Sequence, residues 1–208
     1  MKIGIFGGTF NPPHKGHIRL VKEFTDRLSL DKVFIIPDKR PVHKAWEDLV
    51  IDDMRYEMCC LAFKEPQYEV SRMEIDRYSD SYTVYTLMQL KEQYPDGDFY
   101  LIIGSDMFLS FHKWYRHQVI MDNCTLCVAS RSDADSIYEL RSYAFSQFRI
   151  YIKELEGKGI IISPMEPYEA SSSQIREMIK NGADASGFLS EEVYDYIKQR
   201  GLYGYGKK

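Results

Sequence analysis

The sequence has no excess of basic residues and no long apolar run. Its 27 lysines and arginines are outnumbered by 31 aspartates and glutamates, which gives a formal net charge of −4. Proteins that bind duplex nucleic acid need a basic face, so we expect no nucleic-acid partner. No apolar stretch approaches the ~20 residues that cross a bilayer, and no signal-peptide pattern precedes the first apolar segment. We therefore expect a cytoplasmic protein with no membrane partner.

Cysteine is scarce, and its few copies do not build a metal site. The four cysteines are Cys59, Cys60, Cys124 and Cys127, and only the last two fit a C-x-x-C pattern. That pair lies in the apolar segment CTLCVA, which is typical of a buried strand, where side chains three apart point to opposite faces. No second cysteine pair or histidine pair completes a zinc site. We predict that the cysteines are structural.

The sequence also lacks internal repeats, low-complexity segments and linkers, and its 208 residues suit one domain with a sizeable core. Apolar runs alternate with amphipathic runs, which predicts an α/β fold: a Rossmann-like, doubly wound parallel sheet in a single domain, residues 1–208. The C-terminal helical part is expected at about 171–203, and the site at the carboxyl ends of the strands. Strands are predicted at 3–6, 32–36, 68–70, 99–103, 125–129 and 160–162, and helices at 18–28, 51–63, 81–94, 135–155, 172–180 and 191–200.

The most informative stretch is the turn after the first strand, GGTFNPPHKGH. Gly7 and Gly8 let backbone approach a ligand closely, and the prolines that follow make a rigid turn. If a helix begins near Lys15, His14 and His17 lie three apart at its first turn and face the same way. Unsatisfied N–H groups at a helix start attract anions, so the turn is predicted to hold phosphate. The alternative is an ordinary strand–turn–helix, since neither a G-x-G-x-x-G nor a Walker A pattern is present.

A second anion-binding helix start is predicted near the other end of the chain. Ser171 and Gln174 fit a capping box, and Ser172 and Ser173 add hydroxyl groups. Arg176 follows within two turns and offers a bidentate fork to phosphate oxygens. A plain capped helix is the alternative.

Weaker candidates lie between these two motifs. The loop DKRPVHK contains Lys39, Arg40, His43 and Lys44, and is either a phosphate-binding loop or a solvated surface loop. Ser81 or Asp80 is a possible N-cap of the helix at 81–94.

The strand at 99–103 runs into Gly104 and Asp106, where the acid suits a ribose hydroxyl or a helix cap. Trp114 either stacks on a flat heteroaromatic ring or packs in the core. Arg131 follows the strand CTLCVAS and is either a phosphate ligand or a surface arginine.

These motifs together resemble a known family. GGTFNPPHKGH is similar to the signature of the HxGH-type nucleotidyltransferases. S-Y-T with T-L, I-I-G-x-D, F-x-x-W-Y, I-x-D-N and the ending YIKQRGLY resemble the bacterial nicotinate-nucleotide adenylyltransferases. The segment ASSSQIR departs from the family pattern I-S-S/A-T-x-I-R at Ala170 and Ser173, and Ser173 keeps the hydroxyl. No motif covers residues 133–156.

The resemblance implies a role for each matching position. The implied catalytic residues are His14, His17, Arg176 and Lys44. The implied ATP-binding residues are Gly7, Gly8, Thr9, Phe10, His17, Gly104, Asp106, Ser172, Ser173 and Arg176. The implied pyridine-nucleotide-binding residues are Lys44, Thr83, Trp114, Tyr115 and Arg131.

The implied reaction joins ATP and nicotinate mononucleotide, with release of diphosphate. The histidines would hold the ATP phosphates and neutralise charge growing on the bridging oxygen. Mg²⁺ would arrive on the triphosphate, since it usually takes few protein ligands. An exposed late helix suits a homodimer. The alternatives are a related adenylyltransferase that uses nicotinamide mononucleotide or phosphopantetheine, and a non-catalytic nucleotide sensor.

Overall fold

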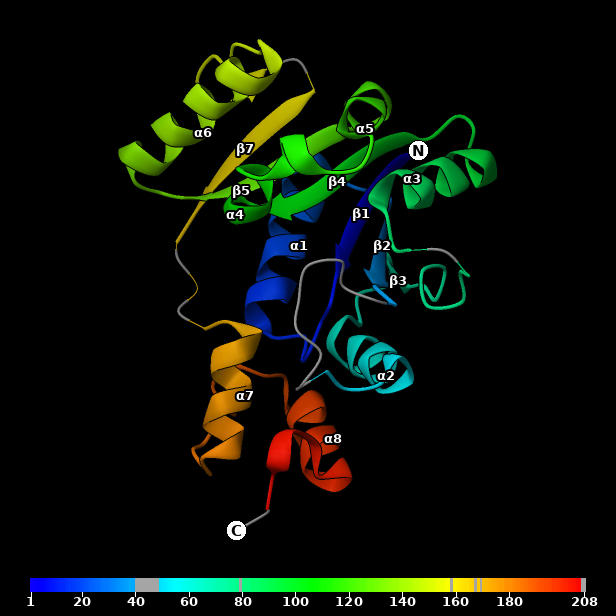
Figure 1. The fold of residues 1–208 in the computed structure, drawn as a ribbon, viewed down its shortest axis with the longest axis vertical. Helices are drawn as coiled ribbons and strands as arrows, with labels where there is room; N and C mark the ends of the chain where they lie inside the picture. Colours follow the sequence, from blue (N-terminus) through cyan, green and yellow to red (C-terminus); the bar gives the residue numbers. More distant parts are fainter. Residues whose placement is uncertain (40–48, 79, 158, 167, 169, 207–208) are drawn as a thin grey trace. The chain divides into compact units, whose positions relative to one another are not determined.

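A computed structural model describes residues 1–39, 49–78, 80–157, 159–166, 168 and 170–206. Its strands form a seven-stranded sheet in the order β3-β2-β1-β4-β5-β7-β6. In chain order (Figure 1), the elements are β1 (Lys2–Gly8), α1 (Lys15–Leu28), β2 (Lys32–Pro37), α2 (Asp52–Ala62), β3 (Tyr68–Val70), α3 (Thr83–Gln93), β4 (Asp98–Gly104), α4 (Ser105–Phe108), η1 (Phe111–Lys113), α5 (His117–Asn123), β5 (Thr125–Arg131), α6 (Ala134–Phe148), β6 (Glu156–Gly157), β7 (Ile160–Met165), α7 (Ser172–Lys180), α8 (Glu191–Arg200) and η2 (Leu202–Gly204).

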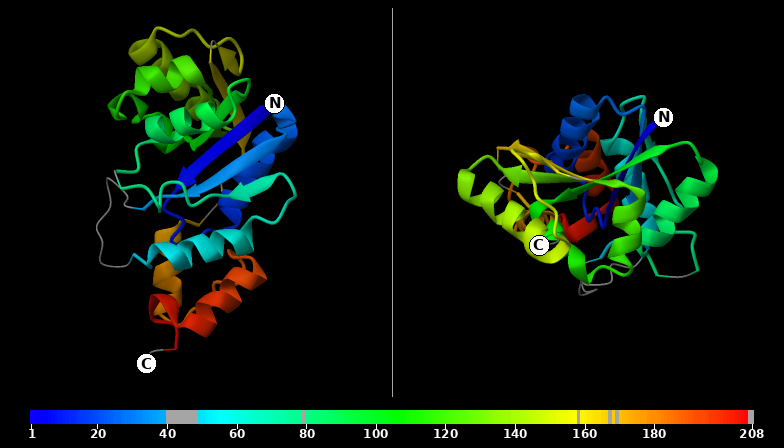
Figure 2. Two further views of the ribbon diagram at one scale, coloured as in Figure 1. Left: turned by 90° about the vertical axis from the view of Figure 1, so that its right-hand side faces the viewer. Right: turned by 90° about the horizontal axis from the view of Figure 1, so that it is seen from above.

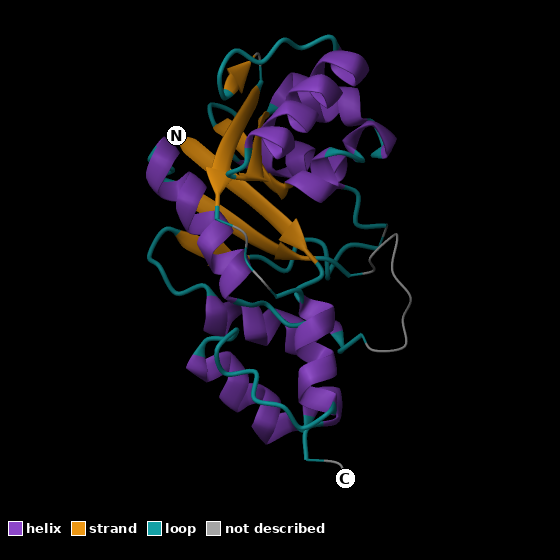
Figure 3. Ribbon diagram, turned by 90° about the vertical axis from the view of Figure 1, so that its left-hand side faces the viewer, coloured by secondary structure: helices purple, strands orange, loops and turns teal. Residues whose placement is uncertain are grey.

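The chain divides into two compact units whose segments alternate along the sequence. Unit 1 comprises Met1–Phe6, Leu20–Val33 and Tyr82–Pro167. Its strands pair in parallel as β1 with β4, β4 with β5, and β5 with β7, and only the short β6 is antiparallel to its neighbour. Helix α1 covers one face of these strands and α5 and α6 cover the other (Figures 2 and 3). The expected doubly wound parallel sheet is therefore confirmed.

Unit 2 comprises Gly7–Arg19, Phe34–Ser81 and Tyr168–Lys208. It contains the carboxyl ends of β1 and β2 with helices α2, α7 and α8, which gather in Figure 1. Apolar residues of the three helices and of the segments next to α7 and α8 form its core. These buried residues are Met58, Ala170, Ile175, Ile179, Ala185, Leu189, Val193 and Ile197.

Elements with strong local signals lie where the sequence predicts them. Helices α7 and α8 have the predicted bounds, and α1 begins at Lys15. The helix predicted at 135–155 is wrong beyond Phe148, because Arg149 adopts a left-handed conformation with φ 58° and ends it. The chain then forms β6, antiparallel to β7. The sequence also gave no signal for the short helices α4 and α5.

Two further expectations are corrected by local geometry. The helix predicted at 81–94 begins at Thr83, and neither Ser81 nor Asp80 is its N-cap; the Ser81 hydroxyl accepts the backbone N–H of Lys39 at 3.1 Å. Cys124 ends α5 and does not lie on β5 as predicted.

All four cysteines are free thiols. Burial raises the pKa of Cys124 to about 12 and also raises that of Cys59, so both stay protonated and unreactive. Within the described ranges, no helix combines the length and the apolar character that a membrane crossing requires.

A fully buried arginine holds the turn after β1 to the end of β2. Arg55 of α2 donates to the carbonyl of Thr9 at 2.6 Å and forms ion pairs with Asp38 at 3.1 Å and Asp52 at 2.7 Å. The Thr9 hydroxyl donates to Asp38 at 3.0 Å, and the Asp38 N–H donates to the carbonyl of Gly8 at 3.0 Å. Arg55 thus joins three segments that the chain brings in separately, and no sequence pattern had marked it.

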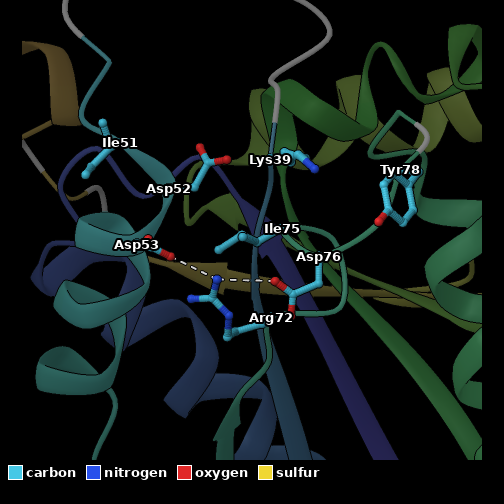
Figure 4. A pocket seen from close by; sticks show the side chains of 8 residues that line it. All are labelled: Lys39, Ile51, Asp52, Asp53, Arg72, Ile75, Asp76 and Tyr78. Atoms are coloured by element: carbon cyan, nitrogen blue, oxygen red, sulfur yellow. Dashed lines mark hydrogen bonds and ion pairs between the residues drawn. The ribbon is translucent and has the colours of Figure 1, made fainter.

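This arginine has a matched control on the surface. Arg72 also pairs with two aspartates, Asp53 at 2.9 Å and Asp76 at 3.2 Å (Figure 4), but its side chain is 37% exposed whereas that of Arg55 is 0% exposed. We predict that Arg55→Ala lowers the free energy of unfolding by about 3–5 kcal/mol, because it removes a fully buried guanidinium and leaves the partly buried carboxylate of Asp38 and the carbonyl of Thr9 without their donor. Arg72→Ala should cost at most about 1 kcal/mol. Urea denaturation of both variants measures the difference, and equal losses would contradict the anchoring role of Arg55.

Candidate functional site

The two histidines of the first turn cap helix α1. His14 directly precedes the helix, and its Nδ1 accepts the backbone N–H of Gly16 at 3.1 Å. His17 lies in the first helical turn, and its Nδ1 accepts the backbone N–H of His14 at 3.1 Å. The bond from His14 N–H to His17 corresponds to one half of a capping box, whereas the His14 side chain accepts the N–H of Gly16 and not that of His17. The spacing of three residues therefore has a structural purpose.

This capping fixes the tautomer of both rings. Because each Nδ1 accepts a hydrogen bond, the neutral imidazole carries its proton on Nε2. The rings are stacked, with centroids 3.7 Å apart. His14 is 8% exposed, and burial lowers its pKa to about 4, so it is neutral near pH 7. His14 thus offers a neutral Nε2–H donor, which differs from the expectation that both histidines neutralise phosphate charge.

Tyr168, which the sequence analysis missed, packs on the same turn. Its ring lies parallel to that of His14, with an interplanar angle of 3° and centroids 5.6 Å apart. A Cβ on Gly16 would lie 2.6 Å from the Tyr168 ring and 2.9 Å from His14. Glycine is therefore required between the histidines because two rings occupy the space of any side chain. Nothing in the residues around Tyr168 signals this contact.

Gly7, Thr9 and Phe10, the other candidates in the first turn, differ in which of their groups a ligand could reach. Among the described residues, a Cβ on Gly7 would meet only the carbonyl of Ile36, at 3.9 Å, so that side of its backbone has room for a ligand. Thr9 uses its hydroxyl to bind Asp38. Phe10 is buried, with its ring 5.2 Å from that of His17 in an edge contact. Phe10 packs against the His17 ring, and its side chain is too buried to contact a ligand.

The serine-rich helix start lies against the first turn. Ser171 forms the predicted capping box with Gln174. The Ser172 hydroxyl donates to the carbonyl of Pro12 at 2.9 Å, and Arg176 Nη1 donates to the carbonyl of Asn11 at 2.9 Å. These bonds span 160 and 165 residues of chain.

Arg176 keeps part of its donor capacity. Its Nη2 donates to the Ser173 hydroxyl at 3.3 Å, and its Nε is buried without a partner in the described part of the chain. Two of the five N–H bonds of a guanidinium are thereby used, which leaves donors for an anion.

Asn11 ties the same turn to two more segments. Its side-chain oxygen accepts the hydroxyl of Tyr203 at 2.8 Å and the backbone N–H of Val50 at 3.3 Å. Burial raises the pKa of Tyr203, which therefore stays protonated and able to donate. The C-terminal motif noted in the sequence thus has a contact at the first turn, a role that only long-range structure reveals.

The remaining predicted residues belong to unit 1. Thr83 is the first residue of α3, and no side chain caps this helix start. Asp106 is exposed in the short α4 and makes no cap bond there; a Cβ on Gly104 would lie 2.8 Å from its carboxylate. The cap explanation for Asp106 is therefore wrong. Arg131 ends β5, opposite Met165 of β7.

The two neighbouring aromatic candidates have different surroundings. Trp114 is half-buried against Phe111, with ring centroids 5.1 Å apart. Tyr115 is exposed and lies 4.8 Å from the ring of Tyr82 and 5.9 Å from that of Tyr85. Lys44 lies outside the described residues.

A pocket of about 580 Å³ in unit 2 (Figure 4) is a poor candidate for a triphosphate. Three aspartates line it, and carboxylates repel a polyanion. Its lining residues are Lys39, Ile51, Asp52, Asp53, Arg72, Ile75, Asp76 and Tyr78. Among the described residues, no three His, Cys, Asp or Glu side chains group as a metal site.

The chain is similar in sequence to known proteins over nearly its whole length. Residues 5–178 match the cytidylyltransferase-like family model. A Geobacter sulfurreducens protein is 37% identical over 214 aligned positions, covering 99% of each chain, and one from Lachnoclostridium phytofermentans is 34% identical over 206, covering 97% of this chain and 98% of the relative. Both are named "Probable nicotinate-nucleotide adenylyltransferase".

The fold has a solved counterpart as well. The Plasmodium falciparum nicotinic acid mononucleotide adenylyltransferase, complexed with NaAD, superposes with a TM-score of 0.76 at 16% identity. The match covers 100% of this chain and 99% of that one. With full-length relatives above 30% identity and a family model that spans both phosphate motifs, the chain belongs to the nicotinate-nucleotide adenylyltransferase family of cytidylyltransferase-like proteins.

Proposed function

We propose that this enzyme transfers the adenylyl group of ATP to nicotinate mononucleotide, giving nicotinate adenine dinucleotide and diphosphate. Family membership supports the reaction class. The observation that carries the proposal is the pair of hydrogen bonds from Ser172 and Arg176 to the turn that holds the histidines. They gather a guanidinium, two Nε2–H donors and two helix starts in unit 2, as a bound polyphosphate requires.

The chemistry needs positioning more than acid–base catalysis. A phosphate oxygen of the mononucleotide attacks the α-phosphorus of ATP, and the bond from that phosphorus to the bridging oxygen breaks as diphosphate leaves. A phosphate monoester is largely ionised at pH 7, with a second pKa near ~6, so no general base is needed. Stabilisation of charge on the phosphates then supplies most of the rate.

Each unit 2 residue has a distinct proposed role. His14 and His17 donate from Nε2 to phosphate oxygens, and the backbone at Gly7, Gly8, Thr9 and Phe10 approaches the nucleotide. Arg176 stabilises the β- and γ-phosphates as they leave, with Ser172 and Ser173 beside it. Lys44 would steady the incoming phosphate or the triphosphate. Mg²⁺ would enter on ATP as part of the substrate.

In unit 1, Gly104 and Asp106 are proposed to contact ribose, and Thr83 with its neighbouring amides to bind the nicotinate carboxylate. Trp114 and Tyr115 would lie against the pyridine ring, and Arg131 would bind the mononucleotide phosphate. We further propose that residues 1–208 act as one domain in the cytoplasm; homodimer formation stays a prediction.

The acceptor decides between the proposed function and its alternatives. We expect diphosphate release from ATP to require nicotinate mononucleotide, in a coupled assay with a panel of acceptor phosphates. Faster release with nicotinamide mononucleotide or phosphopantetheine would assign a different acceptor. Nucleotide binding without release for any acceptor would indicate a sensor.

Arg176 should matter to turnover more than to stability. We predict that Arg176→Ala lowers kcat by about a hundredfold, the scale of one lost charge donor, with Arg176→Lys less affected. Arg200→Ala is the control, because Arg200 lies exposed on α8 and its ion pair with Glu57, at 3.9 Å, is long and exposed to solvent. Steady-state kinetics and melting temperatures separate the two effects. Near-normal kcat in Arg176→Ala would remove it from the mechanism.

Trp114 should distinguish the two substrates. We predict that Trp114→Ala weakens binding of nicotinate mononucleotide about tenfold, because a stacking contact of ~1–3 kcal/mol is lost, and leaves ATP binding unchanged. Titration calorimetry with each ligand measures this, with Phe145→Ala as an exposed aromatic control. Equal losses for both ligands would refute the placement of Trp114.

A further inference from the structure

Tyr168 is fixed to the histidine turn from three directions. Its hydroxyl donates to the carbonyl of Phe188 at 3.2 Å, and the backbone N–H of Lys15 donates to the same carbonyl at 2.9 Å. Its ring lies parallel to His14 and against the Cα of Gly16. One carbonyl therefore sets the position of both Tyr168 and the start of α1.

The His14 ring is stacked with two other aromatic rings. The His17 ring from α1 is stacked on it, and Tyr168 from the segment before α7 is the other aromatic neighbour. Among the described residues, these two are the ionisable groups whose rings stack on the imidazole. Lys15, adjacent in sequence, directs its ammonium to the carbonyls of Ser186 and Gly187 instead.

We propose that Tyr168 is a positioning residue for adenylyl transfer, which holds the His14 ring out of water in the one orientation where Nδ1 caps the helix and Nε2 donates to phosphate. Its relevance to catalysis rests on the proposed function, whereas its effect on His14 does not.

The mechanism of this positioning is exclusion of water. A protonated His14 would carry hydrogen on Nδ1 and lose the bond from the Gly16 N–H. By covering the ring, Tyr168 disfavours the charged form and so preserves the cap. Without Tyr168, the ring would be hydrated and free to turn, and its Nε2 would no longer be held toward one place.

Histidine titration tests the proposal without any substrate. In ¹⁵N-histidine-labelled protein, with the His14 signal assigned from His14→Asn, the wild-type pKa should lie near 4 and Nε2 should carry the proton at pH 7. We expect Tyr168→Ala to raise this pKa by about one unit or more toward 6.5. Tyr168→Phe keeps the ring and should leave it nearly unchanged. Tyr138→Ala, which removes an exposed tyrosine, is the control.

The kinetic arm tests the link to turnover. Tyr168→Ala should lower kcat about tenfold at pH 7. Its kcat should also fall more steeply than that of wild type as pH drops through the raised pKa, beyond the loss that both enzymes share when the acceptor phosphate becomes protonated. An unchanged His14 pKa in folded Tyr168→Ala would overturn the proposal, as would a shifted pKa with wild-type kcat and pH profile. If no acceptor supports turnover in wild type, the reaction assignment fails, and the titration alone still decides whether Tyr168 holds His14.

Discussion

Buried carbonyl groups in the turn after β1 explain why the two ends of the chain meet. Asn11, Pro12 and Pro13 are all buried, and the prolines have no N–H with which to continue a ladder. Their carbonyls still need donors, since an unpaired buried carbonyl is costly. Ser172 and Arg176 supply them from the start of α7. The interaction that satisfies the turn is therefore the one that brings a guanidinium beside the histidines.

The two histidines also combine a structural role with their proposed chemical role. Each imidazole accepts a backbone N–H of the helix start at Nδ1, so the proton of the neutral ring is on Nε2. In the proposed function, one side chain would therefore both cap the helix and donate to phosphate. Gly16 is part of this arrangement because His14 and Tyr168 close around it. A substitution in the H-x-G-H segment would therefore change both the start of α1 and the position of the imidazole rings.

Sequence patterns predicted features whose causes are local. The capping box at Ser171 and the strand–turn–helix after Gly8 follow from neighbouring residues, and both are observed. The end of α6 at Arg149 was missed because a left-handed arginine has no sequence signal. In the site, the meeting of the two phosphate motifs was predictable. The contributions of Arg55 and Tyr168 were not, because both depend on contacts with residues distant in sequence.

The charge state of His14 changes how the site must work. If both imidazoles were cations, they would repel each other across stacked rings 3.7 Å apart. Burial avoids this by keeping His14 neutral near pH 7. In the proposed function, Arg176 would bring positive charge to the turn from another helix, while the neutral His14 would donate a hydrogen bond from a fixed position. With these two roles on different residues, the turn would bind a polyanion without two adjacent buried cations.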